Sequence, residues 1–213
     1  MVIEMNSIIM ADDLAFELGE FFADLKNATD WELTNFGINN NIVCHTSFLD
    51  GSYNASSLAE PIAKINNCPF LCFIYAHGQE DSVFIGANKV FSVSDNYYLL
   101  SNAVIYTFSC NCGGILADKL LENKAILFVG YKGTANCPYG LDGITASVVL
   151  SFIQAFLSGK SAKDSFESLY DAYSTVLRDS TLDPFQRAAF QESRDALVLK
   201  GDENVRVSDL LVV

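Results

Sequence analysis

Basic residues are scarce in this 213-residue sequence: 13 lysines and arginines face 26 aspartates and glutamates, giving a formal net charge of −13. A surface of that sign repels nucleic-acid phosphates and anionic lipid, which argues against direct binding to nucleic acid or to a membrane surface. The imbalance is strongest in residues 1–36, which hold eight acidic residues and one lysine. The charge favours cationic partners or substrates.

Long hydrophobic runs are also missing, and no stretch of 18 apolar residues is present to span a membrane. The N-terminal apolar stretch lacks a basic leader and is interrupted by Glu4, so we expect no secretory signal. Six cysteines without an export signal predict reduced thiols and a cytoplasmic protein. No cysteine pair has zinc-ribbon spacing, so neither a metal nor another cofactor is expected. No phosphate-cradling glycine loop follows the first expected strand, which disfavours a flavodoxin-like ligand-binding domain.

Short, fully apolar runs are what the sequence does contain. Three of them, at residues 69–76, 103–109 and 125–131, have the length and composition of buried parallel strands. Helical periodicity separates and follows them, at 54–65, 114–124, 143–158, 162–178 and from Asp183-Pro184 onward. We also expect a helix at 12–26 capped by Asp12 or Asp13, a strand at 40–48, a hairpin at 82–94, and two strand-like pieces around a turn at 201–204. Alternating strands and helices predict an α/β sandwich with a mostly parallel central sheet.

Two of these apolar strands end in reactive side chains. The run at 69–76 is followed by His77-Gly78, and the run at 103–109 is followed by Cys110. Neighbouring strands lie about 4.8 Å apart, so His77 and Cys110 are predicted to face each other at the carboxyl edge of the sheet, where an imidazole activates a thiol. Taken singly, each residue is more often structural, the histidine as a loop residue and the cysteine as a small hydrophobe. The pairing is more specific, because the sequence has only one other histidine, His45, which lies inside an expected strand.

A strand ending in His-Gly and a later strand ending in Ser109-Cys110, with Gly113 three residues on, resembles the caspase-like cysteine peptidases of clan CD. The pattern is most similar to the CHAT branch, whose cysteine motif reads roughly Ser-Ala-Cys-x-x-Gly. The Gln-Ala-Cys-x-Gly form of true caspases is absent. The resemblance covers about residues 40–213, so residues 37–213 are expected to be a caspase-like, CHAT-type peptidase domain with a three-layer sandwich. Residues 1–36 are expected to be an acidic helical segment, which either docks on a partner or covers one face of the sheet as an amphipathic helix.

The resemblance implies a cysteine endopeptidase with a His77–Cys110 dyad. His77 would be general base and then general acid, Cys110 would attack the scissile carbonyl, and the N–H groups of Gly78 and Cys110 would form the oxyanion hole. Family members of this size commonly act on protein substrates under an activating or sensor protein, in antiviral or other bacterial defence or in cell death. The alternative is a catalytically silent caspase-like interaction module.

Three further features bear on the site, and two of them have two interpretations. Asp142, after the third apolar run, is either the N-cap of a helix or a selector for Lys or Arg at P1, and Asp81 is a second selector candidate. An apolar P1 pocket stays open as well. Cys112 is either a small buried thiol or a redox partner of Cys110. The glycine-rich loop 132–143 is expected to shape the substrate pocket and to be mobile without an activator.

Overall fold

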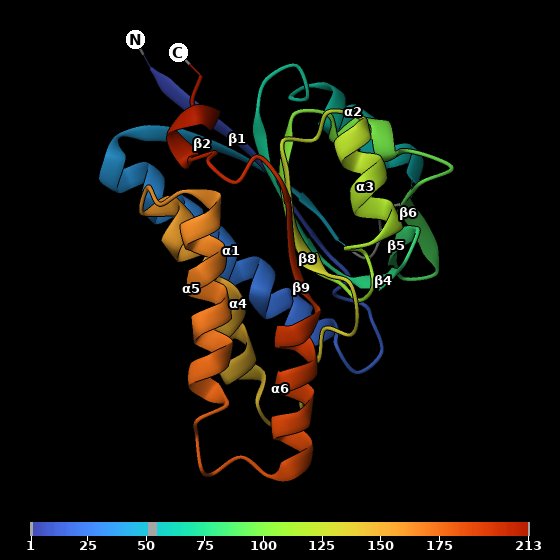
Figure 1. Ribbon diagram of the computed structural model, residues 1–213. Helices are drawn as coiled ribbons and strands as arrows, with labels where there is room; N and C mark the ends of the chain where they lie inside the picture. The colour runs from blue at the N-terminus through green and yellow to red at the C-terminus, as the bar shows by residue number, and fades with distance from the viewer. Residues whose placement is uncertain (1, 51–54, 213) are drawn as a thin grey trace.

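A computed structural model describes residues 2–50 and 55–212. The centre of the molecule is a six-stranded sheet (Figure 1) in the order β2 (Ile42–Leu49), β1 (Ile3–Ala11), β3 (Phe70–Tyr75), β7 (Ala103–Phe108), β8 (Leu127–Tyr131) and β9 (Leu197–Gly201). All neighbours are parallel except β9, which runs antiparallel to β8. The three apolar runs of the sequence are β3, β7 and β8, and they lie side by side inside the sheet. The mostly parallel α/β sandwich is therefore confirmed.

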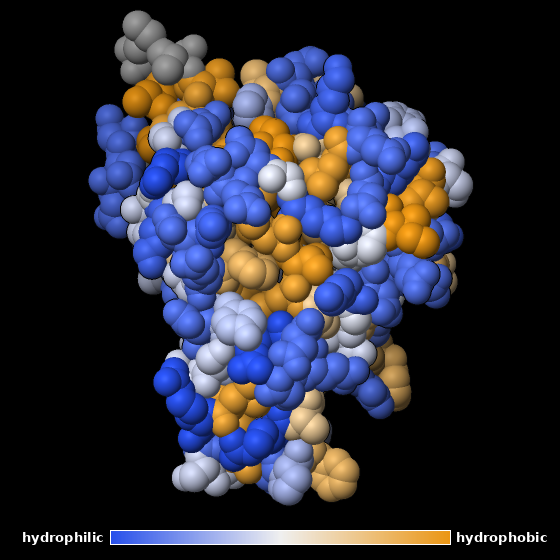
Figure 2. Space-filling view, viewed as in Figure 1, coloured by the Kyte–Doolittle hydropathy of each residue, from blue (hydrophilic) through white to orange (hydrophobic). Residues whose placement is uncertain are grey.

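Helices cover both faces of this sheet. One face packs against α1 (Gly19–Asn40), α4 (Asp142–Leu157), α5 (Ala162–Val176) and α6 (Pro184–Ala196), and the other packs against α2 (Ala55–Ala63) and α3 (Ile115–Glu122) (Figure 1). The second face also carries a small antiparallel sheet of β4 (His77–Gln79), β5 (Ser82–Ile85) and β6 (Asn88–Ser92), with a 3₁₀ turn, η1, at Tyr97–Leu100. Side chains alternate between the two faces along each strand, so two separate apolar cores form. Figure 2 shows an apolar strip between the helices, along β9 at the edge of the sheet.

The N-terminal region differs from the expectation of an acidic helical segment at 1–36. Residues 3–11 form β1, an inner strand of the main sheet, and the helix that follows starts at Gly19 with Leu18 as N-cap, not at Asp12 or Asp13. A polar residue that breaks the apolar pattern of this strand finds a hydrogen-bond partner on the neighbouring strand. Ser7 is buried and its hydroxyl is 2.9 Å from that of Thr46 on β2. The helix also continues past residue 36 and ends at Asn40. Its C-cap, Asn41, has the left-handed backbone conformation.

The C-terminal half follows the sequence expectations more closely. The Ser161 hydroxyl accepts the Asp164 N–H and caps α5, and Asp183 caps α6 with Pro184 at the first helical position. The prediction of a second strand after the turn at 201–204 is wrong, because residues Val207–Leu210 form a 3₁₀ turn, η2. Past that turn, Val212 exchanges two backbone hydrogen bonds of 2.8 Å with Glu4, beside the half of β1 that β3 does not reach. The C-terminus is thereby held to the N-terminal strand.

Candidate active site

Three adjacent strands place His77, Cys110 and Ala135 at the carboxyl edge of the sheet. Tyr75 of β3 and Phe108 of β7 are register partners and point to the α1 side. His77 and Cys110 each follow two residues later, so strand alternation sends both side chains to that same side. Ala135 follows β8, on the other flank of β7. His77, Cys110 and Ala135 line one small hollow, together with Leu18, Phe22, Ala76, Phe108 and Ser109.

His77 stands at the solvent-facing rim of this hollow. The His77 side chain is exposed, and its ring packs edge-on against Phe22 of α1, with the ring centroids 5.9 Å apart. Its backbone starts β4 and pairs with Phe84 of β5. The hairpin therefore fixes the main chain, and an aromatic contact from the N-terminal helix orients the imidazole.

Cys110 is half-buried in the same hollow. Its sulfur accepts a hydrogen bond from the Ala135 N–H at 3.4 Å, and its thiol points to the Ala135 carbonyl at 3.9 Å. The loop that carries Cys110 is itself tied to the end of β8, because the Asn111 N–H donates to the Gly133 carbonyl at 2.8 Å. The backbone N–H and carbonyl of one residue of the 132–141 loop, Ala135, thus hold the thiol on the side of β8.

Cys112 lies beneath this arrangement and is fully buried. Its thiol is within hydrogen-bonding distance of the Cys110 carbonyl at 3.3 Å and of the Ser82 carbonyl at 3.7 Å. Burial raises the pKa of the Cys112 thiol to about 12, so it stays protonated at neutral pH. A buried, protonated thiol is a poor attacking group, which favours the interpretation of Cys112 as a packing residue.

The hollow beside Cys110 is very small in this structure. Its volume is about 10 Å³, close to the minimum that holds one water molecule and far below a side chain. Leu18 and Phe22, from the start of α1, form one wall of it. Neither residue was predicted to belong to the site, because no sequence pattern indicates that the N-terminal segment reaches this edge of the sheet.

Asp142 lies in a second hollow, of about 320 Å³, lined by Glu17, Glu20, Phe21, Asp24, Tyr139 and Asp142. Phe21 of this hollow packs edge-on against Phe108 of the hollow beside Cys110, with the ring centroids 5.5 Å apart. Asp142 is not the helix cap, because Leu141 occupies that position. The Asp142 carboxylate instead accepts the Cys137 thiol at 3.3 Å, and burial together with this carboxylate raises the pKa of Cys137 to about 12. The three acidic residues from the N-terminal segment were expected to meet a partner, not to share a hollow with Asp142.

Asp81 has a different environment. It lies in the β4–β5 turn, accepts the Ser82 hydroxyl at 2.7 Å and is 3.8 Å from the Lys89 ammonium. The Ser82 hydrogen bond, with a smaller contribution from Lys89, lowers the pKa of Asp81. Its carboxylate is therefore engaged within the small sheet, and it lines neither hollow described above.

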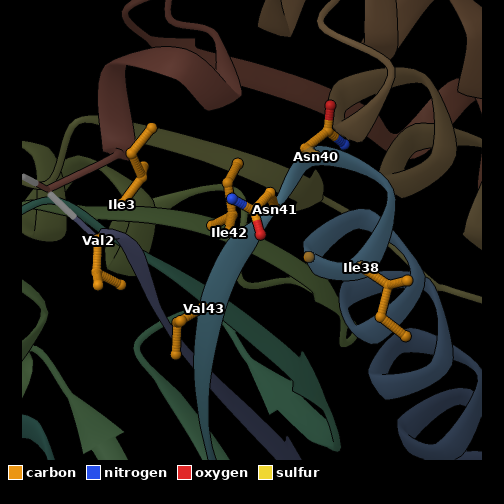
Figure 3. Close-up of a pocket in the computed structure, with 8 residues that line it drawn as sticks. Val2, Ile3, Ile38, Asn40, Asn41, Ile42 and Val43 are labelled. Atoms are coloured by element: carbon orange, nitrogen blue, oxygen red, sulfur yellow. The ribbon is translucent and has the colours of Figure 1, made fainter.

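A third hollow, of about 460 Å³, lies far from this chemistry (Figure 3). It is lined by the starts of β1 and β2 and the end of α1, with Val2, Ile3, Ile38 and Val43 around it, and it contains no cysteine or histidine. Parallel strands put this hollow at the opposite end of the sheet from His77 and Cys110. Within the described ranges, no three His, Cys, Asp or Glu side chains gather to hold a metal ion, and none of the helices there has the length and apolarity of a membrane span.

Comparisons with known proteins give a fold. No family model and no curated protein sequence matches this chain. Among solved structures, the Arg-specific cysteine proteinase gingipain R (RgpB) superposes with a TM-score of 0.63 at 12% identity, over 97% of this chain and 48% of that one. A complex of the Porphyromonas gingivalis RgpB pro- and mature domains gives a TM-score of 0.60 at 14% identity, over 97% and 49%. The chain spans about half the length of these neighbours. Its fold is the caspase-like sandwich of the clan CD cysteine proteinases.

Proposed function

We propose that this chain is a cysteine endopeptidase whose catalytic dyad is His77 and Cys110. One observation carries the proposal: the two side chains come from the ends of adjacent parallel strands and line the same hollow. Open parallel sheets collect their reactive groups at this carboxyl edge. The fold shared with gingipain R agrees with the assignment.

The chemistry follows from these positions. His77 takes the thiol proton of Cys110, the thiolate attacks the scissile carbonyl, and the tetrahedral intermediate collapses to a thioester as His77 protonates the leaving amine. Water then hydrolyses the thioester, with His77 acting again as base. The N–H groups of Gly78 and Cys110 are assigned to the oxyanion, and loss of one such donor typically costs about 10²–10³ in rate.

Asp142 gives the substrate preference in this proposal. Its hollow is lined by four carboxylates, from Glu17, Glu20, Asp24 and Asp142, and its Phe21 packs on Phe108 of the hollow beside Cys110. Such a surface favours a Lys or Arg side chain at P1. Gingipain R is described as Arg-specific, which agrees with this choice. Asp81, held in its hairpin turn, is the weaker of the two selector candidates.

Activation by a protein partner is the second part of the proposal. The hollow of about 10 Å³ admits no substrate side chain until Leu18 and Phe22 move. The β1–α1 loop that leads into these residues exposes Leu14 and Phe16 at 72% and 88%, and such apolar side chains are available to a docking protein. We assign the N-terminal segment to this docking role, under a sensor protein in a bacterial defence or cell-death pathway of a CHAT-type peptidase.

The small volume of the hollow also favours the alternative, a silent interaction module, and one experiment separates the two. A peptide library with every residue at P1 is incubated with the wild-type chain, with Leu18→Ala to open the hollow, and with Leu18→Ala/Cys110→Ala. The peptidase predicts cleavage after Lys or Arg by Leu18→Ala that disappears in the double variant. If Leu18→Ala is folded and binds peptides without cutting them, the chain is an interaction module.

A further inference from the structure

The 132–141 loop approaches Cys110 through the backbone of Ala135. The Ala135 N–H donates to the Cys110 sulfur at 3.4 Å, from the β8 side, whereas His77 lies on the β3 side of β7. A backbone N–H aimed at sulfur stabilises the thiolate over the thiol, because a hydrogen bond to the charged form is the stronger one. The Ala135 amide is therefore placed to assist the same ionisation that His77 promotes.

Helix α6 holds this loop in place through the residues on both sides of Ala135. The Asn136 N–H donates to the buried Ser193 hydroxyl at 2.8 Å, and the Asn136 side-chain amide donates to the Glu192 carboxylate at 3.0 Å and the Ala189 carbonyl at 3.2 Å. The Thr134 hydroxyl donates to the other oxygen of Glu192 at 3.1 Å. Ala135 is thus bracketed by two residues that are both fixed to the same turn of α6.

We infer that Asn136 is a positioning residue: bound to Ser193 and Glu192 of α6, it holds the Ala135 N–H on the Cys110 sulfur and so raises the reactivity of that thiol. The inference rests on the proposed function, in which Cys110 is the nucleophile. It also accounts for the many contacts of Asn136, which touches neither Cys110 nor the hollow around it. The other titratable groups that face Cys110 are His77 from β4, Cys112 from its own loop and Tyr131 from the end of β8.

The test measures thiol chemistry and not proteolysis. Wild-type protein and Asn136→Ala are alkylated with iodoacetamide from pH 5 to pH 10, and the Cys110 peptide is quantified by mass spectrometry. At pH 7 the variant is expected to react about tenfold more slowly, the factor carried by one hydrogen bond to a charged group. The two rates are expected to converge at high pH, where every accessible thiol is ionised. Convergence separates lost thiolate stabilisation from a change in access.

Two more variants make the result decisive. Gln191→Ala, on the same helix, removes only a hydrogen bond to Asp195 and is expected to react like wild type. Glu192→Ala, at an exposed position, leaves the Ser193 contacts of Asn136 in place and is expected to slow Cys110 in the same direction by a smaller factor. If Asn136→Ala unfolds, Glu192→Ala carries the test alone. Unchanged or faster alkylation of Cys110 in the folded variants would overturn the inference, and it would leave the His77–Cys110 dyad to be judged separately by peptide cleavage.

Discussion

The Cys112 sulfur fills the space next to Gly78 that the side chain of any other residue at position 78 would occupy. A Cβ atom built on Gly78 would lie 2.5 Å from that sulfur and 2.3 Å from the carbonyl oxygen of Cys110. The chain after His77 therefore lies directly against the chain that carries Cys110. This close approach explains why a glycine follows the histidine and why a small buried side chain stands at position 112.

Gly78→Ala is expected to reduce peptide cleavage by at least about a hundredfold, the loss typical of one displaced oxyanion donor. The new methyl group must push His77 and Cys110 apart, since backbone atoms and a buried sulfur surround it. Gly143→Ala is the matched control, because a Cβ there meets no atom within 4 Å. Cleavage rates and thermal melts of both variants check the prediction, and a fully active Gly78→Ala would argue against the tight packing of the two loops.

Cys110→Ala is expected to abolish cleavage, whereas Cys112→Ala is expected to keep most of it below its melting temperature. Cys112 contributes packing, so its loss is expected to lower the free energy of unfolding by about 1 kcal/mol. Urea unfolding and a fluorogenic peptide assay measure the two effects on each variant. Loss of cleavage in Cys112→Ala with normal activity in Cys110→Ala would reverse the assignment of the two thiols.

Asp142→Asn is expected to lower cleavage after Lys and Arg by about two- to fivefold, while folding is unchanged. The carboxylate is not the cap of α4, since Leu141 holds that position, so no capping energy is lost. Asp142 is exposed, and an ion pair with an exposed carboxylate is worth about 0.2–1 kcal/mol. The specificity constants for Lys, Arg and Ala at P1 are compared with those of Asp81→Asn. If only Asp81→Asn changes the preference, the selector lies in the β4–β5 turn.

Stability is expected to fall steeply with alkaline pH. The unfolded chain releases the Cys112 proton near 9.0, whereas the folded protein keeps it to about 12. The stabilising effect is therefore complete below about pH 9 and declines as the pH rises from there toward 12, by up to about 1.4 kcal/mol per pH unit. Burial likewise raises the pKa of Cys72, Tyr75 and Tyr173. Urea unfolding at pH 8, 9 and 10 measures the slope, and Cys112→Ala should flatten it, whereas equal slopes would contradict the burial of this thiol.

The sequence predicted the part of the fold that depends on local pattern. β3, β7 and β8 are continuous apolar runs, and β3 and β7 lead directly into His77 and Cys110, so strand adjacency was enough to place these two residues at one edge of the sheet. β1 was missed because Glu4, Asn6 and Ser7 break its apolar pattern, and because its burial between β2 and β3 is a tertiary property. With β1 missed, nothing could place Leu18 and Phe22 in the hollow that His77 and Cys110 line. The contact between the Ala135 N–H and the Cys110 sulfur could not be predicted either, since Ala135 contributes only backbone atoms to it.

The most direct test of the account is covalent labelling by a peptidyl acyloxymethyl ketone with Arg at P1, followed by mass spectrometry of all six cysteines. The reagent is applied to the wild-type chain, to Leu18→Ala and to Leu18→Ala/His77→Ala. The account predicts a thioether on Cys110 alone, formed faster in Leu18→Ala than in the wild type and lost when His77 is also replaced. Three results would contradict a peptidase with His77 and Cys110 as its catalytic residues. They are labelling of several thiols, labelling at the same rate when His77 is replaced, and no labelling in Leu18→Ala.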